Sequence, residues 1–216
     1  MLKGVRGVLF DFDGTLAPNL DLPDMRRQVI QLTVAQNIPE HVYRDQYIVE
    51  VIEAARAYLE KKDPQQARTY ADDAHQRILD IEMTASMNTQ VFEQTRPLFN
   101  RLNNMDVGSV VVTRNCSAAV TQTFPDWSDY LLALLARDQV EQLKPKPGHF
   151  EDALSVLGCA AADAAIVSDG AMDMQTGREL GMRCLGVLTG SSDTQRLMEA
   201  GAHHVVPDLR ALMAAL

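Results

Sequence analysis

The distribution of glycine divides this 216-residue chain into two kinds of sequence. All 12 glycines lie at or before Gly14 or at or after Gly108, and the long segment between them contains none. Because glycine favours turns and a few prolines suffice to separate helices, a glycine-free segment with spaced prolines predicts helices joined by short loops. The sequence therefore predicts a helical segment inserted into a region of different structure.

Apolar residues in this segment recur at three- and four-residue spacing, which is typical of helices with one buried face. The spacing predicts a helix from about Tyr43 between Pro39 and Pro64, and a further helix after Pro64. A shorter stripe of the same kind precedes Pro39, at Met25, Val29 and Leu32. We expect residues 20–86 to form a small helical bundle.

The regions on either side of the bundle alternate between strand-like and helical patterns. After a first apolar run at residues 8–10, the strand-like runs lie at 109–112, 131–135 (the weakest), 164–167, 184–188 and 204–206. Helical patterns lie between them, at 117–124, 147–157, 172–180, 192–200 and 208–215. This alternation predicts an α/β protein with a Rossmann-like, doubly wound parallel sheet. We expect residues 1–18 and 88–216 to form this domain and residues 19–87 to form an all-helical inserted domain.

The composition suits a soluble domain with an insertion and narrows the choice of partner. The chain is 46% hydrophobic and 23% charged, with a net charge of -9 and a pI near 5.0. Such an acidic protein binds nucleic acid and anionic membranes poorly, so we expect neither as a partner. Any site for a phosphate group must therefore be made locally positive by a metal, a lysine or backbone amides.

The cysteines and the absence of a targeting signal indicate where the protein works. The three cysteines, Cys116, Cys159 and Cys184, are far apart and follow neither a zinc spacing nor a disulfide framework. The first apolar run is too short for a signal peptide, and no stretch approaches transmembrane length. We expect a reducing, cytoplasmic setting.

Two carboxylates, Asp11 and Asp13, stand where the first strand ends, just before Gly14. Ligands bind to doubly wound sheets beyond the carboxyl ends of the strands. Alternation along an extended chain places both carboxylates on one side, where they repel unless a cation lies between them or one is protonated. The pattern predicts a metal-dependent carboxylate site, although acidic turns without a function are also common.

Two further strand ends carry candidate binding groups. Thr113 ends one strand, where its hydroxyl and the following amides could donate to a phosphoryl oxygen, or where it could cap the helix near Ser117. Lys144 is held in an extended stretch by Pro145 and Pro147 and could neutralise a carboxylate and a phosphoryl group. The alternative for Lys144 is a solvated basic turn.

A second pair of carboxylates, Asp169 and Asp173, lies at a later strand-to-helix junction. Carboxylate oxygens are the ligands that Mg²⁺ prefers. The alternative is a structural role, in which Asp169 caps the helix and Asp173 offsets its dipole.

The four strand-end motifs together resemble those of the haloacid dehalogenase-like superfamily of phosphotransferases. Asp11-Phe12-Asp13-Gly14-Thr15-Leu16 looks like the first motif, and Lys144 to Pro147 fits the Lys-Pro-x-Pro form of the third. The hydroxyl motif and the acidic motif occur in the order and spacing of the family. The helical segment matches the helical cap by position, as in the branch with phosphoglycolate phosphatase-like and β-phosphoglucomutase-like members.

The resemblance implies a catalytic role for each motif. It implies that Asp11 is the nucleophile, which forms an aspartyl phosphate, and that Asp13 is the acid and base. It implies Mg²⁺ as the cofactor, with ligands from Asp11, the carbonyl of Asp13, Asp169 and Asp173. The phosphoryl group would be held by Thr113, Arg114, Asn115 and Lys144.

The sequence also departs from the family pattern. Ser168-Asp169-Gly170 stands where Gly-Asp-Ser is usual, and Gly170 can occupy a helix-cap position at small cost. Pro18-Asn19 replaces a frequent Asp-Ser pair, and Arg114 replaces a frequent Asn, so the substrate is left open. The leading expectation is a phosphatase for a small phosphorylated metabolite, acting as a monomer or homodimer. The alternatives are a sugar phosphomutase and a non-catalytic, phosphate-binding or regulatory relative.

Overall fold

The computed structural model describes all residues 1–216, and the chain divides into two compact units. One unit combines Met1–Leu20 with Ser86–Leu216, and the other is the segment Asp21–Ala85 between them. The first unit contains a six-stranded sheet, and the second is helical. The predicted fold class, a doubly wound parallel α/β sheet with an all-helical insertion, is confirmed.

The central strand of the sheet is the first in the sequence. The strands are all parallel in the order β3-β2-β1-β4-β5-β6, where β1 is Gly7–Phe10, β2 Gly108–Val112, β3 Ala133–Leu135, β4 Ala164–Ser168, β5 Arg183–Val187 and β6 His204–Val206. In the register of β1, Gly7 pairs with Gly108 on one side and with Ala164 on the other. The carboxyl ends of β1, β2 and β4 therefore lie side by side, at the edge where such sheets bind ligands.

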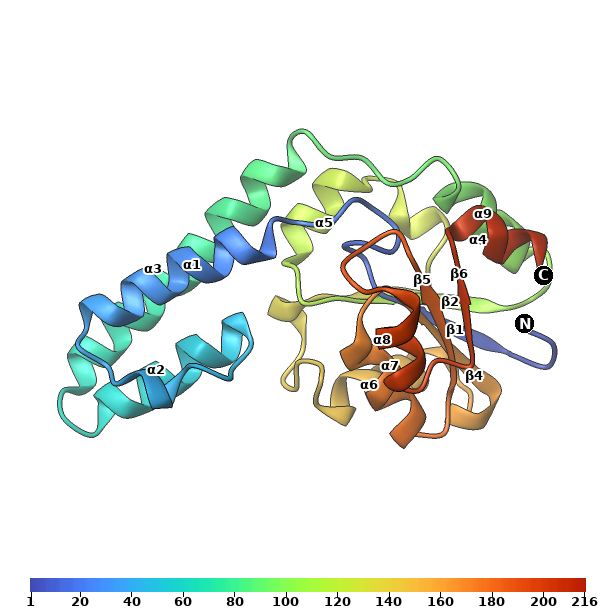
Figure 1. Ribbon diagram of the computed structural model, residues 1–216. Coiled ribbons are helices and arrows are strands. Elements are labelled where there is room, and N and C mark those ends of the chain that lie inside the picture. Colours follow the sequence, from blue (N-terminus) through green and yellow to red (C-terminus); the bar gives the residue numbers. More distant parts are fainter. The chain divides into compact units, whose positions relative to one another are not determined.

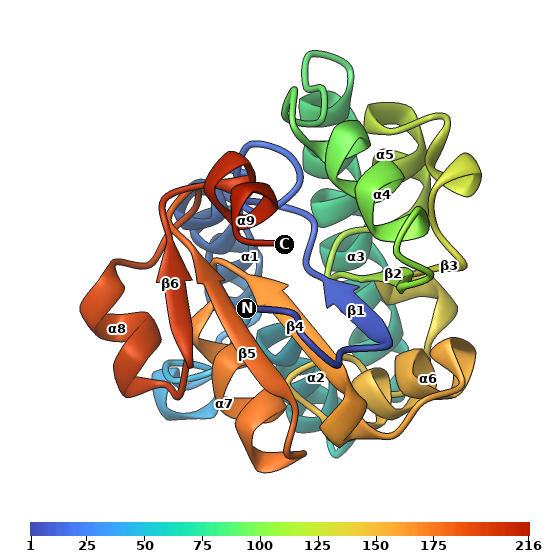
Figure 2. The same cartoon turned by 90° about the vertical axis from the view of Figure 1, so that its right-hand side faces the viewer.

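Helices cover both faces of the sheet (Figures 1 and 2). One layer consists of α4 (Thr95–Asn103), α5 (Ser117–Thr123) and α9 (Leu209–Ala214), and the other of α6 (Pro147–Leu157), α7 (Ala171–Glu179) and α8 (Thr194–Glu199). Alternation along β1 supplies both cores, because Val8 and Phe10 pack with Phe99 of α4 whereas Leu9 packs with Phe150 of α6. The all-buried β1 explains why its sequence is an uninterrupted apolar run.

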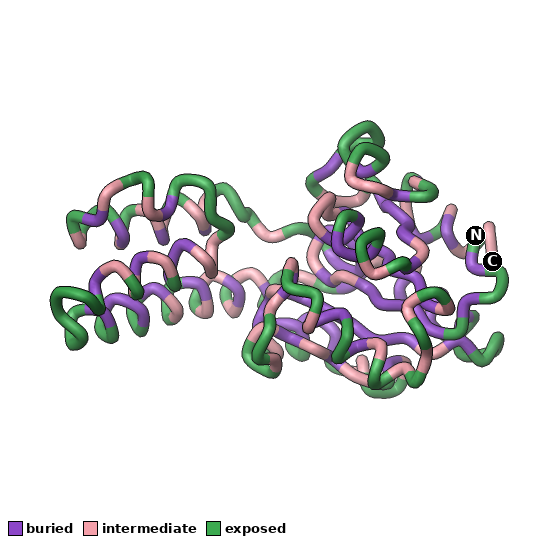
Figure 3. Tube along the Cα trace, turned by 90° about the horizontal axis from the view of Figure 1, so that it is seen from below, coloured by how far each residue is buried: buried purple, intermediate pink, exposed green.

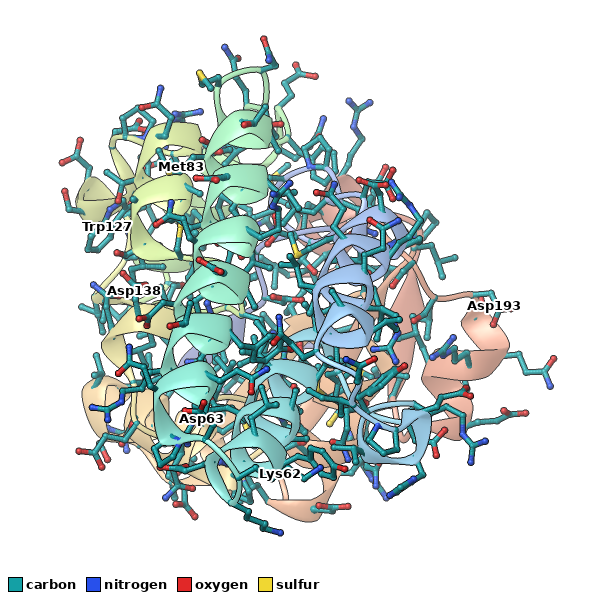
Figure 4. The ribbon with its side chains drawn as sticks, turned by 90° about the vertical axis from the view of Figure 1, so that its left-hand side faces the viewer. Lys62, Asp63, Met83, Trp127, Asp138 and Asp193 are labelled. Atoms are coloured by element: carbon teal, nitrogen blue, oxygen red, sulfur yellow. The ribbon has the colours of Figure 1, made fainter.

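The helical unit has a buried interior of its own. It contains α1 (Leu22–Ala35), α2 (Ile48–Glu60), most of α3 (Pro64–Ser86) and the 3₁₀ turn η1 (Glu40–Val42). Buried positions recur along its helices in Figure 3, and Thr33 and Tyr70 join their hydroxyls 2.7 Å apart inside it. Figure 4 labels Lys62 and Asp63 at the turn before α3. Asp63 caps the helix by accepting from the Gln65 amide, and the Lys62 ammonium lies over the Tyr58 ring. No helix in either unit has both the length and the apolar character needed to cross a membrane.

Two elements differ from the sequence expectation. The helix expected from Tyr43 begins only at Ile48, because Arg26 of α1 donates to the carbonyls of Arg44 and Gln46 and holds this stretch as a turn. The helix α4 was not predicted, although Leu98, Phe99 and Leu102 in it are fully buried. The remaining predicted strands and helices are present, with ends shifted by one or two residues.

Candidate active site

The turn after β1 carries the first two candidate carboxylates. The Asp11 amide donates to the Val167 carbonyl of β4 (3.0 Å), so strand pairing continues one residue beyond β1. Gly14 then adopts a left-handed φ of 78°, which lets the chain turn back toward Ala17. A Cβ at Gly14 would also lie 2.8 Å from the Asp169 carboxylate, so the turn needs glycine for space as well as for conformation.

Lys144 lies between two of the predicted carboxylates. Its Nζ is 2.8 Å from Oδ1 of Asp11 and 2.8 Å from Oδ2 of Asp173. The lysine side chain is only 2% exposed and that of Asp173 only 1%, whereas Asp11 retains 15%. A lysine that is buried and paired with two carboxylates is not a solvated basic turn. Lys146, the other lysine of the motif, is exposed.

The electrostatics of the cluster follow from burial and from the two signs of charge. Burial raises the pKa of Asp11 to about 7, against the lowering effect of Lys144 and with further increases from Asp173 and Asp169. Burial alone would lower the pKa of Lys144, but Asp11 and Asp173 outweigh it and raise the pKa. The lysine therefore stays charged, and a second cation near Asp11 would favour its ionised form.

Asp169 is held in a separate cradle. Its Oδ2 accepts from the Ser191 amide (2.7 Å) and hydroxyl (3.1 Å), and its own amide donates to Thr15 Oγ1 (3.1 Å). A Cβ at Gly190 would fall 2.0 Å from Oδ2 of Asp169. The helix after β4 is capped by Gly170, so Asp169 does not act as its cap. The cap position of Gly170 agrees with the expectation from the sequence.

Ser168 links the carboxylates at the end of β4. Its hydroxyl donates to Oδ2 of Asp173 (2.7 Å), lies 3.4 Å from Oδ2 of Asp11, and accepts from the Gly170 amide (2.9 Å). The other oxygen of Asp173, Oδ1, is buried and has no hydrogen-bond partner. A buried carboxylate oxygen without a partner is costly, so this atom marks a place for a donor, a water or a cation.

The end of β2 arranges the groups around Asp13. Thr113 Oγ1 accepts from the Asn115 amide (3.1 Å), whereas the cap of α5 is Cys116, whose Sγ accepts from the Ala119 amide. The capping alternative for Thr113 is therefore wrong. The Asn115 side chain donates to both oxygens of Asp13, at 3.2 and 3.1 Å, and so orients that carboxylate.

The structure brings the predicted residues together in two groups. Asp11, Lys144 and Asp173 are in direct contact, and Asn115 contacts Asp13. Asp169 is joined to the first-motif turn through Thr15. The guanidinium of Arg114 donates to the main-chain carbonyl of Lys144, so it supports the lysine loop.

The residues present fit Mg²⁺. No three His, Cys, Asp or Glu side chains are arranged to hold an ion among themselves, and Mg²⁺ is commonly bound by one or two carboxylates with the remaining positions filled by water. All candidate donors are oxygens, the ligand type that Mg²⁺ prefers, and the buried Oδ1 of Asp173 has no hydrogen-bond partner. The ligand set predicted from the sequence, which consists of Asp11, the main-chain carbonyl of Asp13, Asp169 and Asp173, stays a prediction.

Sequence reasoning missed several residues that build this site. Ser191 and Gly190 lie after β5 and hold or make room for Asp169. His149, which bonds to the main chain of Lys144, was also missed. Asn115 was predicted to hold the phosphoryl group, but the bond from its side chain to Asp13 was not predicted. A Gly-Ser pair after a predicted strand was the available signal for the first two, and His149 directly follows the Lys-Pro-x-Pro-Gly stretch.

The fold and this cluster define the class of the protein, an α/β enzyme with an acidic site at the carboxyl edge of its sheet. Residues 8–187 match the family of haloacid dehalogenase-like hydrolases. The phosphoglycolate phosphatase of Pectobacterium atrosepticum is 25% identical over 198 residues, which span 88% of this chain and 82% of that relative. The chain therefore belongs to the haloacid dehalogenase-like hydrolase family.

Solved structures agree with this assignment at the level of the fold. A hydrolase from Pseudomonas syringae has a TM-score of 0.72 at 18% identity and covers 97% of this chain and 96% of its own. A predicted phosphoglycolate phosphatase from Haemophilus somnus has a TM-score of 0.68 at 14% identity and covers 98% of each chain. The resemblance described from the sequence is confirmed, and so is the expected enzyme class, a phosphatase of this family.

Proposed function

We propose that the chain is a Mg²⁺-dependent phosphatase that acts on a small phosphorylated metabolite through an aspartyl phosphate on Asp11. The observation that carries this proposal is the contact of the buried Lys144 ammonium with both Asp11 and Asp173. The ammonium offsets part of the negative charge of these carboxylates, and a bound metal ion would supply the further positive charge that a phosphate ester needs in a protein of net charge -9. None of the three cysteines lies in a disulfide, which favours a cytoplasmic setting.

The first half of the reaction transfers the phosphoryl group to the enzyme. A carboxylate oxygen of Asp11 attacks phosphorus, and the bond from phosphorus to the leaving oxygen breaks. Asp13, in its protonated form, gives its proton to that leaving oxygen, so the product departs as a neutral alcohol. Lys144 and the donors around Thr113 stabilise the charge on the other phosphoryl oxygens, and Mg²⁺ supplies further charge neutralisation when bound.

The second half returns the enzyme to its initial state. Asp13, now a carboxylate, takes a proton from water while the water oxygen attacks phosphorus, and inorganic phosphate leaves as Asp11 is released. The Asn115 amide group donates to both oxygens of Asp13 and so fixes the direction of that carboxyl group.

The substrate class is narrowed by the relatives. Several matching curated proteins are phosphoglycolate phosphatases, among them those of Pectobacterium atrosepticum and Pseudomonas savastanoi. Phosphoglycolate and other small phosphorylated hydroxy acids are therefore the first esters to test, followed by sugar phosphates. The helical insert is proposed to act as a cap that selects among them.

The test is phosphate release by metal-stripped protein to which single ions are returned. Mg²⁺ and Mn²⁺ should restore turnover, and Ca²⁺ should compete with Mg²⁺ without supporting it, because its larger shell of six to eight ligands at about 2.3–2.6 Å can take both oxygens of Asp11. Asp11→Asn should fold and lose at least ~10³-fold in rate. Full activity without a divalent ion refutes the metal site, and conversion of sugar phosphates without phosphate release would identify a mutase.

A further inference from the structure

His149 is a buried histidine beside the lysine loop, and the reaction proposed above leaves it without a role. It is the third residue of α6 and has no exposed surface. Its ring does not sit among apolar side chains alone, because both nitrogens bond to the main chain. Nδ1 accepts from the Lys144 amide (3.0 Å), and Nε2 lies 3.0 Å from the carbonyl oxygen of Leu135, the last residue of β3.

These two partners fix the protonation state of the ring. A main-chain amide can only donate and a main-chain carbonyl can only accept, so Nδ1 must be unprotonated and Nε2 must carry the proton. The imidazolium form, with protons on both nitrogens, would place two donors against each other at Lys144. Burial first, and then the Lys144 charge, lower the pKa of His149 to about 4, in keeping with the neutral ring.

The contacts join three parts of the site. The main chain of Lys144 is held at its amide by His149 and at its carbonyl by Arg114. Leu135, which accepts from His149, also accepts from the Thr113 amide (3.1 Å). The ring therefore connects the start of the lysine side chain to the strand end that carries the hydroxyl motif. A lysine with four rotatable bonds keeps its ammonium on two carboxylates only if its Cα is fixed.

We propose that His149, as the neutral Nε2–H tautomer, is a positioning residue that fixes the main chain of Lys144 and so aims its ammonium at Asp11. This inference rests on the proposed function for its kinetic consequence, but the tautomer and the bond to Lys144 can be observed without any substrate. The acceptor at Nδ1 is the part of the ring that positions Lys144, because it is the ring atom that bonds to the lysine main chain.

Three substitutions separate the two nitrogens. His149→Asn keeps an acceptor near the position of Nδ1, His149→Gln keeps a donor near that of Nε2, and His149→Leu removes both at similar volume. We expect kcat of the Asn variant within about threefold of wild type and kcat of the Gln and Leu variants lower by roughly 10- to 100-fold, with little change in KM, since a displacement near 1 Å can cost that much.

The matched control is His203, whose Nδ1 accepts from the Cys184 amide (2.9 Å) near the start of β5, at the opposite edge of the sheet. His203→Asn and His203→Leu alter the same kind of bond away from the cluster and should leave kcat unchanged. Equal kcat for wild type and all three His149 variants would overturn the proposal. So would an Asn variant that is folded but as slow as the Leu variant.

The spectroscopic test needs no activity. In wild-type protein with ¹⁵N-labelled histidine, His149 should show a protonated Nε2 and an unprotonated Nδ1 at pH 7, and the Lys144 amide should shift in the Gln and Leu variants more than in the Asn variant. A protonated Nδ1 at pH 7 overturns the inference even if a variant fails to fold. If wild type releases no phosphate from any ester, the proposed function fails while these spectra still decide the role of His149.

Discussion

At the scale of single residues, the arrangement of charge in the cluster predicts how the two lysines of the loop differ. Lys144→Ala would leave the buried carboxylates of Asp11 and Asp173 facing each other without a cation. We expect a loss of at least ~10²-fold in kcat and of about 3–5 kcal/mol in the free energy of unfolding, measured by urea titration without metal. Lys146→Ala, at an exposed position, should change neither, and the reverse ranking would contradict the geometry.

The neutral state of His149 predicts a pH dependence of stability. Its pKa is about 4 in the folded protein and 6.5 in the unfolded chain, so between these values the unfolded state binds more protons. Its full contribution to the free energy of unfolding is present above pH 6.5. As the pH falls towards 4, this contribution decreases by roughly 2–3 kcal/mol. Lys144, Asp152 and Asp173 are the charged groups that act on the ring.

The measurement is the difference in unfolding free energy between wild type and His149→Asn at pH 7.5, 6 and 5. The titration of Asp11 affects both proteins equally and therefore cancels in this difference. Its effect on stability is opposite to that of His149, because the pKa of Asp11 is raised in the folded protein. The advantage of wild type should shrink steadily towards pH 5. A difference that stays constant over this range would show that His149 does not titrate as described.

Sequence reasoning at this scale found the residues with distinctive chemistry but not those that orient them. Asp11, Asp13, Lys144, Asp169 and Asp173 stand at strand ends that are readable from the pattern of apolar runs. The bond from Asn115 to Asp13 spans 102 positions and depends on two strands being neighbours, so no local pattern specifies it. His149 is only five residues from its partner, but its second bond reaches β3.

At the scale of elements, the close packing of the loop between β5 and α8 against Asp169 predicts the effect of adding one methyl group at Gly190. Gly190→Ala would place a Cβ 2.0 Å from Oδ2 of Asp169 and force that carboxylate out of its cradle. We expect at least tenfold weaker activation by Mg²⁺ with the fold retained, read from the Mg²⁺ dependence of phosphate release and from circular dichroism. The carboxylate has little room to retreat, because Ser191 already holds the same oxygen.

Gly148→Ala is the matched control for this change. Its Cβ would lie 2.7 Å from Oε1 and 2.8 Å from Cδ of Gln142, which form the flexible end of that side chain and can move aside, and 3.0 Å from its Cβ. Activation by Mg²⁺ should therefore stay normal in this variant. If both alanine variants kept wild-type activation, the glycine at 190 would not be needed to seat Asp169.

Strands and helices could be predicted where the spacing of apolar residues follows a single period. They were predicted wrongly where contacts between distant residues set the ends of the element. The strands β1, β2 and β4 are buried on both faces and read as apolar runs. The start of α2 was placed too early because the apolar spacing continues through Tyr43, whereas Arg26 binds the carbonyls that a helix would use. The sequence of residues 43–47 contains no pattern from which the contact with Arg26 could be predicted.

At the scale of the whole molecule, the separate interiors of the two units predict that the insert can be removed. The sheet unit, Met1–Leu20 with Ser86–Leu216, has cores on both faces of its sheet, so a chain with Asp21–Ala85 replaced by a flexible linker should fold. We expect it to hydrolyse a small aryl phosphate while losing most of its selectivity among phosphorylated metabolites. Equal selectivity with and without the insert would refute the proposed role as a cap.

The central position of β1 has a consequence for synthesis on the ribosome. Its four residues are synthesised before their partners Gly108 and Ala164, which follow only after the whole helical insert. At about 5–20 residues per second, the strand waits on the order of ten seconds for its first neighbour. During that wait the insert can complete its local contacts, whereas the apolar run Gly7–Phe10 stays unpaired. The newborn chain therefore exposes an apolar strand that is fully buried in the folded protein for this whole interval, which makes Gly7–Phe10 a natural site for chaperone protection.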